Sequence, residues 1–234
     1  MKYLQSESFL GDNECAEDAA SSTKLVEIQL EQLQEKIAAT TAVHSPEQRL
    51  TLITEYGYTL LQLNRFEEAW QSARSSLDEA IACELWLQAV ETCDIMFQAE
   101  QDESIKALAH GIWLSVTFPI DPELSVAMLQ HLIDETPDRS DGAAVAAATA
   151  GYIVGLRATD DQLESLQFFT NQLLGQVARR HSQIEEQEIF DFWIQQLELD
   201  DPGKFLPRLA QVLDLLVADD WWFNRDHLRE TIPD

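Results

Sequence analysis

The chain has 234 residues, of which 45% are hydrophobic, a proportion large enough to build one or two packed cores. It contains only 8 glycines and 7 prolines, fewer turn residues than a β-rich protein of this length would need, so the composition favours helices. The 42 acidic residues outnumber the 15 basic ones and give a net charge of −27, which argues against binding to nucleic acids or to anionic membranes.

The charge and the cysteines also indicate the kind of partner and the compartment. A basic protein surface would be the electrostatic complement of this chain. The alternative interpretation is that the acidity serves solubility alone or reflects a salty or acidic habitat. Cys15, Cys83 and Cys93 are too widely spaced for a disulfide framework or a zinc site, and we expect the last two to be small buried residues within helices. Neither a signal-peptide pattern nor a membrane-spanning run is found, so we expect a cytoplasmic protein.

The N-terminal part of the chain divides into two segments. Residues 1–22 are acidic, small and non-periodic, and we expect them to form a disordered tail. Residues 23–234 are expected to form a single helical-repeat domain. Its first helix is predicted over 24–39, where Leu30, Leu33 and Ile37 share one face.

Three helix-start signals recur along this domain, at Ser45-Pro46, Asp121-Pro122 and Asp201-Pro202. In each signal a side-chain oxygen can accept from free backbone amides, and a proline needs no N–H in the first helical turn. The prolines are spaced at about twice a period of 38 to 40 residues. This recurrence predicts stacked pairs of helices that begin near residues 46, 84, 122, 160 and 202.

The spacing of apolar residues predicts the members of these pairs. A helix from Pro46 and a second helix from Phe66 are separated by a short break at Asn64-Arg65, so we expect them to be antiparallel. Further helices are predicted over residues 84–98, 102–117, 122–135, 142–157 and 160–180. A capping-box pattern at Ser182 and Glu185 predicts the start of another helix. The last helix is predicted over 202–217, where Pro207 should either kink it or delay its start. The sequence therefore predicts an all-α protein of about ten helices.

One helix pair, at about residues 46–80, carries a family pattern. Ile53, Tyr56, Gly57 and Leu60 follow the spacing of the first helix of a tetratricopeptide repeat, and the segment 63–69 resembles its inter-helix turn. The chain departs from the family in three ways: Ala73 replaces a larger aromatic residue, no proline closes the repeat near Ile81, and the period exceeds 34 residues. The resemblance implies a tetratricopeptide-like α-solenoid of stacked antiparallel helix pairs, which acts as a scaffold or binding protein.

The sequence contains no motif for catalysis or for binding a cofactor or a metal. Its histidines complete no zinc or di-iron motif, and it has no glycine-rich phosphate loop and no nucleophile elbow. The nearest approach to a metal-ligand cluster is His131 with Asp134 and Glu135 on one helix. In a chain this acidic, such a trio is typical of a solvated helix face.

Two local patterns lead to structural expectations. Gly151-x-x-x-Gly155 follows a run of alanines and predicts a close crossing of two helices. Trp221-Trp222-Phe223 is the most distinctive aromatic cluster, and it has two interpretations. The cluster either covers the apolar end of the last helix pair or forms an exposed anchor for a protein partner, so these three are the candidate partner-binding residues.

The sequence thus predicts a non-enzymatic adaptor that binds a basic or helical segment of a protein partner in an acidic groove. One version of this prediction is an accessory or assembly chaperone for a multi-subunit enzyme. The alternative is an all-helical enzyme or small-ligand-binding protein, with a site assembled from distant residues such as His110, Trp113 and Tyr152. A third interpretation is homodimerisation through the helix at 24–39. No cofactor is expected.

Overall fold

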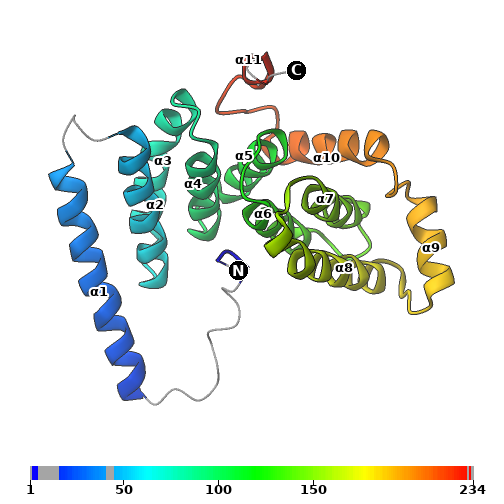
Figure 1. Cartoon of the computed structure of the whole chain (residues 1–234), viewed down its shortest axis with the longest axis horizontal. Coiled ribbons are helices and arrows are strands. Elements are labelled where there is room, and N and C mark those ends of the chain that lie inside the picture. The colour runs from blue at the N-terminus through cyan, green and yellow to red at the C-terminus, as the bar shows by residue number, and fades with distance from the viewer. Residues whose placement is uncertain (1, 5–15, 41–44, 231, 233–234) are drawn as a thin grey trace. The chain divides into compact units, whose positions relative to one another are not determined.

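The computed structural model describes residues 2–4, 16–40, 45–230 and 232, with side chains from residue 22 onward in the first helix. These residues form eleven helices and no strand (Figure 1), which confirms the predicted all-α class. In chain order the helices are α1 (Ala16–Ala39), α2 (Pro46–Gln62), α3 (Phe66–Ala82), α4 (Trp86–Gln98), α5 (Ser104–Thr117), α6 (Pro122–Glu135), α7 (Asp141–Arg157), α8 (Asp160–Ser182), α9 (Gln187–Gln196), α10 (Pro202–Val217) and α11 (Arg225–Glu230).

The chain forms two compact units, where the sequence predicted one domain over 23–234. The N-terminal unit comprises Gln5–Leu114, and the C-terminal unit comprises Ser115–Asp234 together with Met1–Leu4. The boundary falls inside α5, where no change in composition marks it. Within the predicted tail of residues 1–22, α1 begins at Ala16, whereas residues 5–15 lie outside the described set, as do Cys15 and His44.

The predicted helix-start signals form as expected. Ser45 and Gln48 make a capping box, in which the Ser45 hydroxyl accepts from the Gln48 N–H at 3.2 Å and the Gln48 side chain accepts from the Ser45 N–H. Asp121 and Asp201 each cap the helix that follows them. The helices that were expected to open the five pairs begin at Pro46, Trp86, Pro122, Asp160 and Pro202. Pro207 lies inside α10 and does not delay its start.

Several helices end in a left-handed residue that is not glycine. After α2, α3 and α9, the residues Asn64, Glu84 and Glu198 have φ of 55°, 56° and 52°. In each case the left-handed residue and the next one donate their N–H groups back to carbonyl oxygens of the last helical turn. This is the Schellman arrangement, which turns the chain within three residues, and after α2 and α3 the next helix packs back against the one that has just ended.

In the N-terminal unit, α2 and α3 form a hairpin, α4 packs against both of them, and α1 packs on α2. Gly57 is buried at the contact between α2 and α4, where the side chain of Ile95 lies against it. Cys93 is also buried, and burial, together with the nearby Asp94 carboxylate, raises the pKa of its thiol. Cys83 was predicted to be buried within a helix as well, which is wrong: it is exposed and is the C-cap residue that follows α3.

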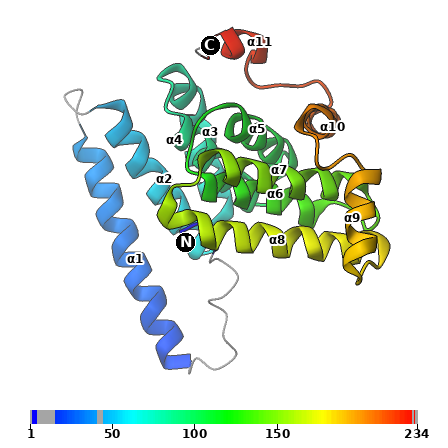
Figure 2. The same ribbon diagram turned by 45° about the vertical axis from the view of Figure 1, so that its right-hand side comes forward.

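In the C-terminal unit, α7 is the central helix. It packs against α6, α8 and α10, and Figures 1 and 2 show α6, α7 and α8 side by side. The residues 142–150 of α7 are buried on every side of the helix, and most of them are alanines. Small side chains let three neighbouring helices approach the same backbone, which is why this helix has no polar face.

Three arginines of the C-terminal unit donate to the carbonyl ends of other helices rather than only to carboxylates. The acceptors are the carbonyl oxygens of Ser115 and Val116 for Arg157, of Ile133 for Arg180, and of Leu197 for Arg208, at distances of 2.5 to 2.9 Å. The last carbonyls of a helix have no partner inside it and carry partial negative charge. These arginines therefore connect α7 to α5, α8 to α6, and α10 to α9.

The predicted capping box at Ser182 and Glu185 is wrong. Ser182 is the last residue of α8, and Gln183 ends that helix with a φ of 55°. The next helix, α9, begins at Gln187, and its N-cap Glu186 makes no side-chain cap bond. Because residues 183–186 form the turn between two helices, α8 is longer and α9 is shorter than the pattern indicated.

Among the described residues, no helix combines the length and the apolar composition needed to cross a membrane.

Candidate partner-binding groove

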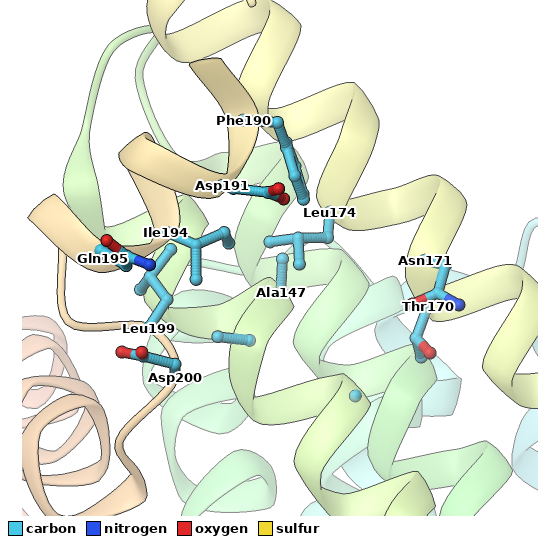
Figure 3. Close-up of a pocket in the computed structure, with 12 residues that line it drawn as sticks. Ala147, Thr170, Asn171, Leu174, Phe190, Asp191, Ile194, Gln195, Leu199 and Asp200 are labelled. Atoms are coloured by element: carbon cyan, nitrogen blue, oxygen red, sulfur yellow. The ribbon is translucent and has the colours of Figure 1, made fainter. Parts of the chain in front are cut away.

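A hollow of about 460 Å³ lies between α7, α8 and α9 of the C-terminal unit (Figure 3). Each helix contributes residues one, three or four positions apart, so that one stripe of each helix faces the hollow. The residues that line it are Ala147, Ala148 and Gly151 of α7, Thr170, Asn171 and Leu174 of α8, Phe190, Asp191, Ile194 and Gln195 of α9, and Leu199 and Asp200 of the connection to α10.

The α7 side of the hollow is made of very small residues. Gly151 is exposed, and a Cβ built on it would meet no atom within 4 Å, as is also true of Gly155. The predicted close crossing of helices at these two glycines is therefore wrong. A glycine inside a helix destabilises it by roughly 1 kcal/mol relative to alanine, and no packing contact at Gly151 offsets this cost. Because Gly151 has no side chain, space remains in the hollow at this position.

The inner surface of the hollow is apolar. Figure 3 shows the side chains of Leu174, Phe190 and Ile194 directed toward one another across the gap between α8 and α9. All three are half-buried, so part of each side chain remains accessible from the hollow. Such a surface favours an apolar group, because removing its accessible area from water is favourable by about 25 cal/mol per Å².

The rim of the hollow carries polar and acidic groups. Asp191 and Asp200 are exposed, and neither forms an ion pair with any residue that the structure describes. Asp191 accepts one hydrogen bond, from the Gln187 amide at 2.7 Å. The side-chain amides of Asn171 and Gln195 make no hydrogen bond within the described part of the chain. The rim therefore presents two negative charges and two amides to a ligand.

A second hollow of about 370 Å³ adjoins the first along α8. The two share Asn171, Leu174 and Phe190, and the second is also lined by Arg179, Glu185 and Glu186. Because these residues are shared, we treat the two hollows as one groove, which we call the α8–α9 groove. Its charged lining comprises four carboxylates and one guanidinium, so its field is negative overall.

A hydrogen-bond network positions the α9 wall. The Trp193 Nε1–H on α9 donates to Nδ1 of His181 on α8 at 3.4 Å. Because Nδ1 accepts this bond, the imidazole proton lies on Nε2. Nε2 in turn donates to the Asp141 carboxylate of α7 at 3.1 Å. Arg208 of α10 lies 3.2 Å from the other Asp141 oxygen and also donates to the end of α9. The other three helices, α7, α8 and α10, therefore help to fix the position of α9.

The aromatic residues predicted to bind a partner do not line this groove. Trp221, Trp222 and Phe223 are half-buried, as expected if they covered the end of the last helix pair. Trp221 is held against α10, because its Nε1–H donates to Asp214 at 3.2 Å and the Arg225 guanidinium lies 3.9 Å from its ring centre. Trp221 therefore packs against α10, while part of the surface of all three aromatic residues stays accessible, so both interpretations of the cluster remain predictions.

The other candidate residues are not assembled into a site. His110 is fully buried, and its Nδ1 lies 2.6 Å from the Lys106 carbonyl oxygen. His110 and Trp113 belong to the N-terminal unit, whereas Tyr152 belongs to the other unit and packs edge-on against Phe205. His131, Asp134 and Glu135 share α6, but no group of three potential ligands in the described residues is arranged to hold a metal ion.

Sequence reasoning missed the groove as a whole. Two large apolar residues of α9, Ile189 and Phe192, are 49% and 64% exposed, and Trp193 is the buried residue of that helix. One sequence feature that could have indicated the groove is the pair Phe190 and Asp191, an apolar and an acidic residue next to each other on one side of a short helix. A second was a glycine at the end of an alanine run.

No family model matches this chain, and no match was found among curated proteins or solved structures.

Proposed function

We propose that this protein is a non-enzymatic adaptor, built from tetratricopeptide-like helix pairs, which binds a segment of a protein partner in the α8–α9 groove. The observation that carries the proposal is an apolar hollow that is lined by Gly151 and bordered by the carboxylates of Asp191 and Asp200, neither of which forms an ion pair with a described residue. Helical-repeat proteins use hollows between successive helices to hold peptides, and apolar anchors supply most of the binding energy in such complexes.

The groove specifies the chemistry of the partner segment. A large aliphatic or aromatic side chain would fill the space between Leu174, Phe190 and Ile194. Lysine or arginine residues flanking it would reach the carboxylates on the rim, and a net charge of −27 would speed the encounter with a basic partner. The proposed ligand is therefore a basic segment with one bulky apolar anchor.

A cytoplasmic location and a role as an assembly chaperone for a multi-subunit enzyme belong to the same proposal. Cys83 and Cys93 are free thiols, as is usual for proteins of a reducing compartment. An acidic groove that shields a basic, apolar segment until its own partner arrives would serve such a role.

The experiment is a peptide selection followed by matched variants. A phage library of random 12-residue peptides would be selected on the full chain, and the enriched peptides measured by fluorescence anisotropy. We expect enrichment of a bulky apolar residue flanked by lysine or arginine. Selection of acidic peptides, or no enrichment at all, would contradict the proposal.

Two glycines of the same helix supply the matched variants. Gly151→Leu places a side chain in the groove, whereas Gly155→Leu places one on the same helix away from the groove, and both positions have open space. We expect Gly151→Leu to abolish peptide binding without lowering the melting temperature, because leucine favours a helix more than glycine does, and we expect Gly155→Leu to bind normally. Equal binding by both variants would place the peptide elsewhere.

The role of the rim carboxylates is tested separately. Replacing Asp191 and Asp200 together by asparagine should weaken binding by about fivefold at low salt and by less at high salt, since exposed charge pairs contribute up to about 1 kcal/mol. Glu55→Gln removes one charge from an exposed position in the N-terminal unit and should leave binding unchanged.

The alternative of a small-ligand-binding protein has one observation in its favour. The hollow of about 460 Å³ falls within the range of about 300 to 1,000 Å³ that small-molecule sites occupy. A thermal-shift screen of small cationic and aromatic compounds distinguishes the two functions. Stabilisation by such a compound that is lost in Gly151→Leu, without any selected peptide, would favour the small-ligand function.

A further inference from the structure

The first described residues of the chain are bound to the C-terminal unit through one carboxylate. The backbone N–H groups of Tyr3 and Leu4 both donate to Glu123 Oε1, at 2.6 and 3.2 Å. Both residues are half-buried. Two successive N–H groups that converge on one oxygen form a concave donor pair, an arrangement that proteins use to bind anions.

Glu123 is placed to receive such donors. It lies in the first turn of α6, after the N-cap Asp121, where the helix dipole stabilises a negative charge. Glu123 is only 6% exposed, and it forms no ion pair with a cation among the described residues. Burying a carboxylate is unfavourable unless hydrogen bonds compensate for the lost water, and the two N–H groups provide this compensation.

We infer that Glu123 and the first turn of α6 form a docking site for a turn of peptide backbone, and that residues 2–4 of the same chain, which bend at Tyr3 and Leu4, are its occupant. The site recognises main-chain N–H groups, so its affinity does not depend on a particular side chain. It is separate from the α8–α9 groove, and this inference does not rest on the proposed function.

The test is amide hydrogen exchange of the full chain, followed by NMR at Tyr3 and Leu4. Hydrogen bonds to a charged group slow exchange, and we expect both amides to exchange at least about tenfold more slowly than in an unstructured chain. In Glu123→Ala this protection should be lost. In Glu123→Gln, whose amide oxygen still accepts but carries no charge, the protection should be intermediate.

The control is Glu135→Gln, which removes an exposed carboxylate at the opposite end of α6 and should leave both amides protected. Fast exchange of both amides in the unmodified chain, or protection that persists in Glu123→Ala, would overturn the inference. Protection that falls on dilution would show that the segment comes from a second copy of the chain and would overturn the assignment of the occupant. Circular dichroism of each variant would verify that α6 is intact.

Discussion

Gly57 and Ile95 are in such close contact that a Cβ on the glycine would lie 2.8 Å from Cδ1 of the isoleucine. Contacts this short between carbon atoms are repulsive, and Ile95 is only 1% exposed, so it has little room to move away. The pair therefore sets how closely α2 and α4 can approach.

Replacing Gly57 by alanine should destabilise the protein by about 1–2 kcal/mol, because overpacking outweighs the better helix propensity of alanine. Ile95→Val removes Cδ1 and should recover part of this loss, so that the double variant is more stable than the sum of the single changes indicates. Chemical denaturation of the four proteins measures the coupling. Gly155→Ala, which has open space, should instead stabilise by up to about 1 kcal/mol, and a loss there would contradict the argument.

Replacing Arg157 by methionine should destabilise the protein by about 2–4 kcal/mol. The change keeps most of the apolar stem but removes two hydrogen bonds to the end of α5, at 2.6 and 2.7 Å. Burial lowers the pKa of Arg157, as expected for a guanidinium paired with carbonyl oxygens rather than with a carboxylate.

Arg157→Lys should recover only part of the stability, because an ammonium group does not reproduce the planar fork. Arg65→Met serves as a comparison, since Arg65 pairs with Glu68 at the surface and should matter little. If Arg157→Met and Arg65→Met melted alike, the carbonyl contacts would have no measurable role in stability.

Replacing Glu84 by glycine should stabilise the protein by about 0.5–1 kcal/mol. A left-handed backbone is strained in any residue with a Cβ, whereas glycine adopts it freely, and Glu84 has a φ of 56°. Asn64 has a similar φ, but asparagine tolerates it better, so Asn64→Gly should have a smaller effect. Thermal unfolding compares the two, and a larger gain at Asn64 would be inconsistent with this explanation.

Asp161 should titrate at an unusually low pH. The Thr159 hydroxyl donates to its carboxylate, and this bond, with the backbone amides at the start of α8, lowers the pKa of Asp161 below its ordinary value of 3.8. A lowered pKa means that the folded state favours the charged form. The stabilisation is therefore complete above the ordinary pKa and is lost as the pH falls through the lowered value.

Carbon-detected NMR of the carboxyl groups measures this titration directly. Thr159→Val removes the hydroxyl and should move the pKa of Asp161 up toward 3.8. Asp160 is the neighbouring carboxylate and serves as an internal comparison in the same spectra. A pKa of Asp161 that did not respond to Thr159→Val would exclude the hydroxyl as the main cause.

Features with a local cause could be predicted from the sequence. Ser45, Asp121 and Asp201 start helices because a capping oxygen and a proline act within one turn, and their helices begin at the predicted residues. The capping-box pattern at Ser182 and Glu185, which includes no proline, failed because α8 continues through Ser182 and ends at the left-handed Gln183. A motif of four residues contains no information about the helix that precedes it.

Features that depend on a distant neighbour could not be predicted. The spacing of Gly151 and Gly155 shows that one side of a helix is small, but not whether another helix lies against that side. Gly57 has a neighbour, whereas Gly151 faces an open hollow. The α8–α9 groove was missed for the same reason, because its lining comes from three helices and a loop whose packing no single stripe specifies.

The arginines that hold helix ends together have a consequence for the behaviour of this protein in electrolyte solutions. Their links run to neutral carbonyl groups over short, partly buried distances, which mobile ions screen weakly, whereas the repulsion among exposed carboxylates acts through solvent and is screened strongly. Dissolved salt should therefore relieve the repulsion and preserve the links. The fold is thus suited to media rich in counter-ions, where a protein held together by surface ion pairs would lose its attractive contacts.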